Sequence, residues 1–180
     1  GIVYGSYKPI DSGLINKGNL LDVDGLAVDC VVLGKSLPII KKHINFEKNY
    51  FWVVYPRNKN TETLHIQIAG VWEPFFEKEN SGESIQEANA KLNSLNLSNN
   101  FFSIRGRLIF INTTQKELVI KVSISKNSTK PNNKSFKLTI KGVLPMDYLN
   151  SFISINAIRK GNSLHMDSFE IIETDFVKNI

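Results

Sequence analysis

Lysine and arginine occupy polar positions in three alternating segments of the C-terminal half of the sequence, residues 101–112, 117–125 and 134–142. Successive side chains of a β-strand point to opposite faces, so these cations would share one solvent face of a sheet. The cations on that face are Arg105, Arg107, Lys121, Lys137 and Lys141. Such a face can bind phosphates and release the counterions of a nucleic acid, which predicts an affinity that falls steeply with salt.

The connecting segments of the same half carry further cations that could follow a phosphate backbone. They are Lys116, Lys126, Lys130, Lys134, Arg159 and Lys160. Residues 101–172 have 11 Lys and Arg against 4 Asp and Glu, a net charge of +7, whereas residues 1–100 have 10 against 11, a net charge of −1. A basic module beside a nearly neutral one indicates a polyanionic partner. The alternative is that the lysines only solubilise a β-surface and protect its edges.

Two short motifs resemble parts of ligand sites but lack the rest. Gly34-Lys35-Ser36 matches the end of a phosphate-binding P-loop, yet the glycine that this loop needs five residues earlier is replaced by Asp29. Asp22-Val23-Asp24-Gly25 matches the start of a calcium loop, but no carboxylates follow at ligand spacing. Turn or edge-strand carboxylates are the better interpretation of the second motif.

The remaining reactive side chains also predict no chemistry. His43, His65 and His165 have no Cys, Asp or Glu at a metal-ligand spacing. Cys30 is the single cysteine, which excludes an internal disulfide, and it lies in an apolar segment where a buried thiol is inert. We therefore expect no enzyme, no catalytic residue, no metal and no cofactor.

Residues 101–173 are expected to form five short strands that close into a small β-barrel. The inward positions of the first three strands are expected at Phe102, Ile104, Leu108, Phe110, Leu118, Ile120, Val122, Ile124, Phe136, Leu138 and Ile140. The fourth and fifth strands are expected at 151–159 and 163–173, joined by a tight turn at 160–162. A bulge in the fifth strand is expected to move the inward register to Phe169 and Ile171.

The N-terminal half is less regular in its pattern. Residues 1–19 are rich in glycine and have little periodicity, which predicts an irregular arm. Residues 20–75 predict a β region with at least three strands, including a hairpin of 50–55 with 64–72. Residues 76–100 are expected to be a linker with a helix at about 85–95, and 174–180 a tail.

With five strands and a connector between the third and the fourth, residues 101–172 resemble the OB-fold superfamily. The resemblance rests on Gly106 in the long first strand, on the third strand at 136–142 and on the closing hairpin at Gly161-Asn162. The segment is also similar to small uncharacterised basic proteins of cyanobacteria and plastids. The expected fold class is mainly β, with an OB-like barrel preceded by a smaller β-sheet region and one connecting helix.

The resemblance implies oligonucleotide binding on the second and third strands and on the loops beside them. It places Lys121, Lys137 and Lys141 on the binding face, and Lys116, Arg159 and Lys160 on the flanking loops. The expected function is therefore non-enzymatic binding of single-stranded DNA or RNA. One departure is that the expected outward positions carry serine, threonine and lysine, whereas single-strand binders usually expose aromatic rings on which bases stack.

A protein-interaction or assembly subunit, docked on an acidic partner surface, is the alternative function. In the nucleic-acid hypothesis, the N-terminal half would supply a partner surface or the interface of a homo-oligomer. No membrane is expected as a partner, because the longest apolar runs are far shorter than the ~20 residues of a spanning helix. The expected location is the cytoplasm or the plastid stroma.

Overall fold

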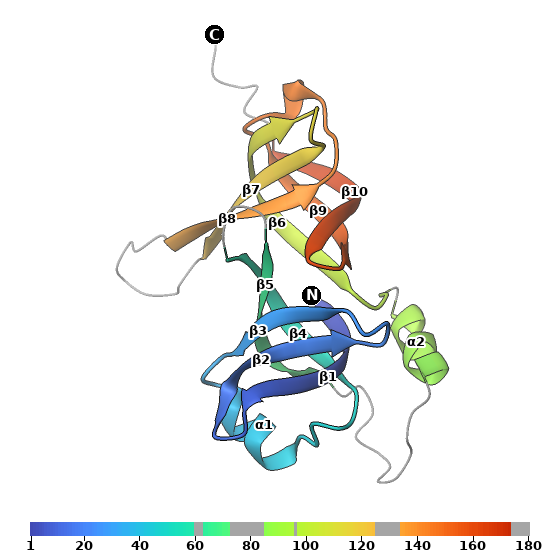
Figure 1. Cartoon of the computed structure of the whole chain (residues 1–180). Helices are drawn as coiled ribbons and strands as arrows, with labels where there is room; N and C mark the ends of the chain where they lie inside the picture. The colour runs from blue at the N-terminus through green and yellow to red at the C-terminus, as the bar shows by residue number, and fades with distance from the viewer. Residues whose placement is uncertain (60–62, 73–84, 96, 125–133, 174–180) are drawn as a thin grey trace. The chain divides into compact units, whose positions relative to one another are not determined.

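The computed structural model describes residues 1–59, 63–72, 85–95, 97–124 and 134–173 (Figure 1). The chain divides into two compact units. The first unit comprises Gly1–Pro56 and His65–Phe101, and the second comprises Arg57–Leu64 and Phe102–Ile180.

Five strands close into a barrel in the N-terminal half (Figure 1). They are β1 (Ile2–Asp11), β2 (Leu14–Asp22), β3 (Ala27–Val32), β4 (Tyr50–Asn58) and β5 (Leu64–Trp72). Strand β1 pairs antiparallel with β2 and β4, β2 pairs antiparallel with β3, and β3 pairs parallel with β5. Because β5 also neighbours β4, the pairings run around a closed ring. This is the Greek-key strand order of a five-stranded OB-fold barrel.

Two helices accompany this barrel. Helix α1 (Leu37–His43) follows β3, and Ile40 is its buried residue. Helix α2 (Ile85–Ser94) agrees with the helix expected at 85–95. Leu92 of α2 packs with Tyr4 and Phe51, so this helix covers apolar side chains of β1 and β4. The barrel interior itself is filled by large side chains such as Trp52, whose Nε1 donates a 2.8 Å hydrogen bond to the Gly5 carbonyl oxygen.

The prediction of an irregular arm at residues 1–19 is wrong, because this segment forms β1 and most of β2. Its glycines mark close approaches between strands. A Cβ on Gly5 would clash with the carbonyl oxygen of Leu21, and one on Gly18 would clash with that of Lys8. Glycine in a strand often marks such an approach. The N-terminal half is therefore a complete five-stranded barrel, where the sequence predicts only a smaller β-sheet region.

The second unit repeats the same strand order. Its elements are β6 (Phe101–Asn112), β7 (Glu117–Ile124), β8 (Lys134–Lys141), the short 3₁₀ helix η1 (Met146–Tyr148), β9 (Phe152–Lys160) and β10 (Ser163–Glu173). Strands β6, β7 and β8 pair antiparallel in sequence, β8 pairs parallel with β10, and β10 pairs antiparallel with β9. Strand β9 returns to pair with β6. The OB-like order expected for this half is confirmed.

Most expected inward positions of the second unit are correct. The buried side chains among them are Phe102, Ile104, Leu108, Leu118, Ile120, Leu138 and Ile140. Ile124 is 37% exposed, in contrast to the prediction, because it lies at the end of β7. The bulge expected in the last strand is present, between Met166 and Ser168. Phe169, expected to face inward beyond it, is 39% exposed, in contrast to the prediction.

The expected inward orientation of Phe110 is wrong. Its side chain is 48% exposed, and Ile111 is buried in its place. The cause is a register shift between Leu108 and Phe110, where β6 has one residue more than β7. A β-bulge of this kind turns the following side chains to the opposite face.

Gly106, in the first strand of the second unit, provides a test of how closely β6 approaches β7. Gly106→Ala should lower the free energy of unfolding by roughly 1–3 kcal/mol, the usual cost of overpacking. The added Cβ would lie 2.5 Å from the Lys121 carbonyl oxygen and 2.7 Å from Cγ2 of Ile120. Urea unfolding measures the change. Gly34→Ala is the matched control, because a Cβ there meets no atom within 4 Å, and equal losses in the two variants would contradict the close approach.

Candidate nucleic-acid interface

Three cations lie in direct register across β6, β7 and β8. Arg107 is opposite Lys121, and Lys121 is opposite Lys137. Directly opposite residues of antiparallel strands share a face, with Cβ atoms about 4.5–5.5 Å apart. Lys121 and Lys137 are exposed, whereas Arg107 is half-buried and donates a 2.6 Å hydrogen bond from Nη1 to the Asn150 carbonyl oxygen. We call these three residues the cationic row.

The pair of Lys121 with Lys137 in the cationic row is electrostatically unfavourable in the free protein. Like charges directly opposite each other in a sheet destabilise it, by an amount comparable to the ~0.2–1 kcal/mol of other cross-strand pairs. Among the residues that the structure describes, no carboxylate forms an ion pair with Lys121 or Lys137. A bound anion would relieve this repulsion, so the row favours a phosphate-bearing ligand.

A second row on the same face is mixed in charge. Lys141 of β8 is opposite Glu117 of β7 and, on its other side, opposite His165 of the parallel strand β10. The Lys141 Nζ forms an ion pair with the Glu117 carboxylate. The positive charge of Lys141 is therefore already matched, unlike that of Lys121 and Lys137. We call Glu117, Lys141 and His165 the mixed row.

The two rows lie on the same face of the sheet, with one residue pair between them. Lys121 and Glu117 are four residues apart on β7, as are Lys137 and Lys141 on β8, so their side chains point the same way. Four residues of a strand span about 13 Å. The pair of Val119 with Thr139 lies between the rows. The second and third strands of an OB-fold, which bind ligands in that superfamily, here carry both rows.

The other expected binding residues surround these rows or lie outside the description. Arg105, Lys116, Lys134 and Lys160 are exposed. Lys116 is in the turn between β6 and β7, with a left-handed φ of 53°, and its carbonyl oxygen accepts a hydrogen bond from the Gly142 amide. Lys126 and Lys130 lie outside the described residues.

The expected loop position of Arg159 is wrong. Arg159 lies within β9 and is 3% exposed. Inward positions of β9 alternate with outward ones, as Ile155 and Ala157 show, so position 159 also faces inward. Its Nη1 donates a 2.8 Å hydrogen bond to the Gly161 carbonyl oxygen, so the side chain braces the β9–β10 turn.

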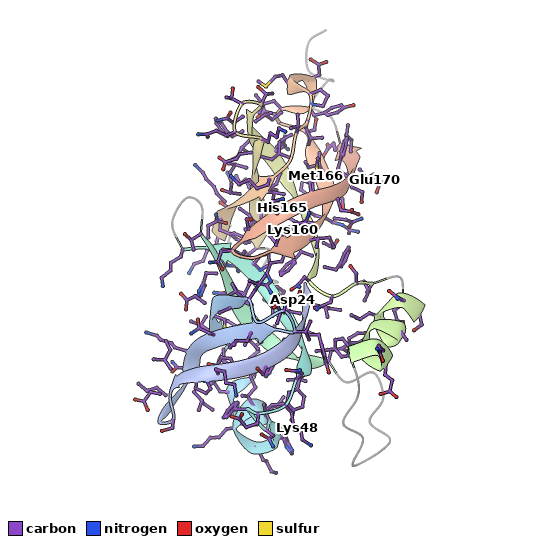
Figure 2. The ribbon with its side chains drawn as sticks, turned by 45° about the vertical axis from the view of Figure 1, so that its right-hand side comes forward. Asp24, Lys48, Lys160, His165, Met166 and Glu170 are labelled. Atoms are coloured by element: carbon purple, nitrogen blue, oxygen red, sulfur yellow. The ribbon has the colours of Figure 1, made fainter. Side chains whose placement is uncertain are left out.

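His165 is a site residue that the sequence does not single out. Its Nε2 lies 3.0 Å from the Ser163 hydroxyl oxygen. Burial, followed by the positive charges of Lys160 and Lys141, holds the pKa of His165 below its usual value. Figure 2 labels Lys160 and His165, which come from the paired strands β9 and β10. The residue escapes notice in the sequence because its neighbour Lys141 comes from a parallel strand distant in the chain.

Two models of known families match the chain, one in each half. Residues 1–79 match the model of the PatR RNA-binding protein, N-terminal OB-fold domain. Residues 104–173 match the cyanobacterial OB-fold-like RNA-binding domain, C-terminal. The chain belongs to the PatR family of RNA-binding proteins. A comparison with curated proteins finds no match.

The PatR assignment confirms the main functional prediction and extends it. The chain binds RNA through OB-fold domains and belongs to a non-catalytic family. The OB-fold resemblance of the C-terminal half is confirmed, and the N-terminal half, which lies outside that resemblance, is a second OB-fold domain. Of the partners predicted from the sequence, RNA is the one that the family establishes.

The corresponding face of the N-terminal PatR domain has a different chemistry. Across β2 and β3, Asn19 is opposite Asp29 and Lys17 is opposite Val31. His65 of β5 adds an Nδ1 atom 3.5 Å from the Asp29 carboxylate. Cations therefore line up on the second and third strands of the C-terminal domain, whereas the N-terminal face is polar and mixed.

Two further observations concern metal binding and membrane insertion. Within the described ranges, no three His, Cys, Asp or Glu side chains are grouped so that they could hold a metal ion. The described helices are all too short or too polar to cross a membrane.

Removal of the carboxylate in the mixed row should strengthen RNA binding. Glu117→Gln leaves the Lys141 ammonium without its partner, so RNA affinity should rise, and its salt dependence should steepen by about 0.7 in log–log slope, the value for one additional phosphate contact with a single strand. Fluorescence anisotropy across a potassium chloride series measures both. Glu170→Gln is the control, since it changes the net charge equally from an exposed position on β10. Equal effects of the two variants would show that only net charge matters.

The lowered pKa of His165 predicts pH-dependent RNA binding. A phosphate near the ring would favour the protonated form, so binding takes up a proton and affinity should rise as pH falls from about 7.5 to 5.5. The charged groups around the ring are Lys141, Lys160 and Glu117. His165→Gln should bind RNA with a flatter pH profile in the same anisotropy assay. An unchanged profile in this variant would assign the pH dependence to other groups.

Proposed function

We propose that this chain binds single-stranded RNA through the cationic row of its C-terminal domain, contacts mainly the phosphate backbone, and requires no particular sequence. The single observation that carries the proposal is the register of Arg107, Lys121 and Lys137 across three neighbouring strands. Three aligned cations can follow consecutive phosphates of one strand, and phosphate contacts carry no sequence information. The cytoplasm, where RNA is available, is the proposed location.

The side chains beside the row support contact with the backbone. Ser123 of β7 is opposite Ser135 of β8, next to the pair of Lys121 with Lys137. Small hydroxyl side chains can donate to phosphate and sugar oxygens without selecting a base. Arg105, exposed two residues before Arg107 on β6, extends the positive surface in the same direction.

An acidic protein surface is the other partner for which the cationic row would be suited. No feature of the described residues favours that partner over RNA, and the family assignment supports RNA. The two partners are separable in one experiment, because an acidic protein that competes for the row would displace labelled RNA from it.

The test removes the two exposed lysines of the row. Lys121→Gln with Lys137→Gln should weaken binding of a labelled single-stranded RNA and reduce the log–log salt slope by about 1.4, which corresponds to two phosphate contacts. Anisotropy titrations over a range of salt concentrations provide both values. Binding that keeps the wild-type slope would overturn the proposal.

The matched control neutralises two lysines elsewhere. Lys41→Gln with Lys42→Gln makes the same change in net charge on α1, where both side chains are exposed. This variant should retain the wild-type slope. A loss equal to that of the row variant would show that the binding depends on total charge and not on the row.

A further inference from the structure

Phe110 projects from the face that carries both rows. It is opposite Val119 of β7, and Val119 is opposite Thr139 of β8, the pair that separates the cationic row from the mixed row. Its side chain is 48% exposed. Within the described residues, no other aromatic ring stacks against it, whereas the partly exposed Phe169 contacts the ring of Tyr148 at 5.9 Å between centroids.

The bulge in β6 causes this orientation. Leu108 is opposite Ile120 and Ile111 is opposite Leu118, and all four side chains are buried. Three steps along β6 therefore match two steps along β7. The extra residue lets Phe110 face outward while the core contacts continue on both sides. Bulges that re-aim one side chain in this way are often found next to functional sites.

The ring lies within reach of the cationic row. Phe110 is opposite position 119, so Lys121 lies two residues along β7 on the same face, beyond the bulge, and Glu117 lies two residues along β7 in the other direction. A phosphate bound by Lys121 would leave its nucleotide base beside the phenyl ring. Exposed aromatic rings beside a basic groove are the usual stacking platform of proteins that bind single strands, because every base has a π-face.

We propose that Phe110 stacks on an RNA base next to the cationic row, and that this contact makes the C-terminal domain prefer single-stranded over double-stranded RNA. The inference rests on the proposed function, because the row must hold the phosphates that bring the base to the ring. A base paired in a duplex is stacked between its neighbours and cannot reach the ring. The row alone would bind phosphates of either form.

The experiment compares variants at position 110 with single-stranded and duplex RNA of the same sequence, by anisotropy. Phe110→Ala should weaken single-strand binding roughly 5- to 150-fold, the range for loss of one stacked base, and should leave the salt slope unchanged. Its affinity for the duplex should stay at the wild-type value. Because the side chain is half exposed, the variant should fold normally, which circular dichroism checks.

Two further variants separate stacking from simple apolar contact. Phe110→Trp should retain single-strand affinity, and RNA should change the fluorescence of the new indole, whereas Phe110→Leu should behave like Phe110→Ala. Phe169→Ala is the control for loss of a phenyl ring elsewhere in the domain and should bind as the wild type does.

The outcomes distinguish this inference from the proposed function. If Phe110→Ala keeps wild-type affinity while the Lys121 and Lys137 variant loses salt-sensitive binding, the stacking contact is absent and backbone binding stands. If Phe110→Ala weakens single-stranded and duplex RNA equally, the preference for single strands is overturned. If neither variant changes binding, both proposals fail.

Discussion

The register of β6, β7 and β8 is the constraint on which the candidate site depends. Leu108, Ile120 and Leu138 are buried in the core of the C-terminal domain, and the cationic row occupies adjacent positions on the outer face. Because side chains alternate, a slip of one residue would bury cations and expose the core. Burial of one Leu or Ile side chain stabilises by about 1.5–3 kcal/mol, more than the ~0.2–1 kcal/mol of a like-charge pair. The apolar contacts therefore impose the alignment of the cations.

The two domains use one strand order for two kinds of surface. In each, the first strand pairs with the second and the fourth, and the third pairs parallel with the fifth. The first strand of each also contains a glycine, Gly5 in one and Gly106 in the other, where a side chain would clash with the second strand. Outer positions are free of these packing demands. They carry aligned cations in the C-terminal domain and the Asn19, Asp29 and His65 group in the N-terminal one.

Strict alternation made the C-terminal strands predictable. From Phe102 to Leu108, and in 117–125 apart from Val119, apolar and polar residues alternate, and both the strands and the shared face of Lys121 and Lys137 follow from that pattern. The sequence pattern does not predict the N-terminal barrel, because glycines that lie where two strands approach closely have the same local appearance as glycines in a loop. Only the opposite strand distinguishes the two, and it lies elsewhere in the sequence.

The errors within the site have similar non-local causes. Arg159 is adjacent to a turn in the sequence, yet the alternation of β9 directs it inward, and its guanidinium donates a hydrogen bond to the Gly161 carbonyl oxygen of that turn. The partner of Lys141 across β10, His165, follows from a parallel pairing that no short motif encodes. The orientation of Phe110 depends on how β6 and β7 compensate for unequal spacing between core residues.

The bulge in β6 also has an evolutionary consequence. One surplus residue between two core contacts decides whether an aromatic ring belongs to the interior or to the surface, and the amino-acid composition of the strand hardly changes. Because neighbouring residues of a strand point to opposite faces, Phe110 faces outward as long as Ile111 keeps its core position opposite Leu118. Related chains could thus gain or lose the exposed ring through a shift of the bulge along the strand, which a comparison of residue types alone would overlook.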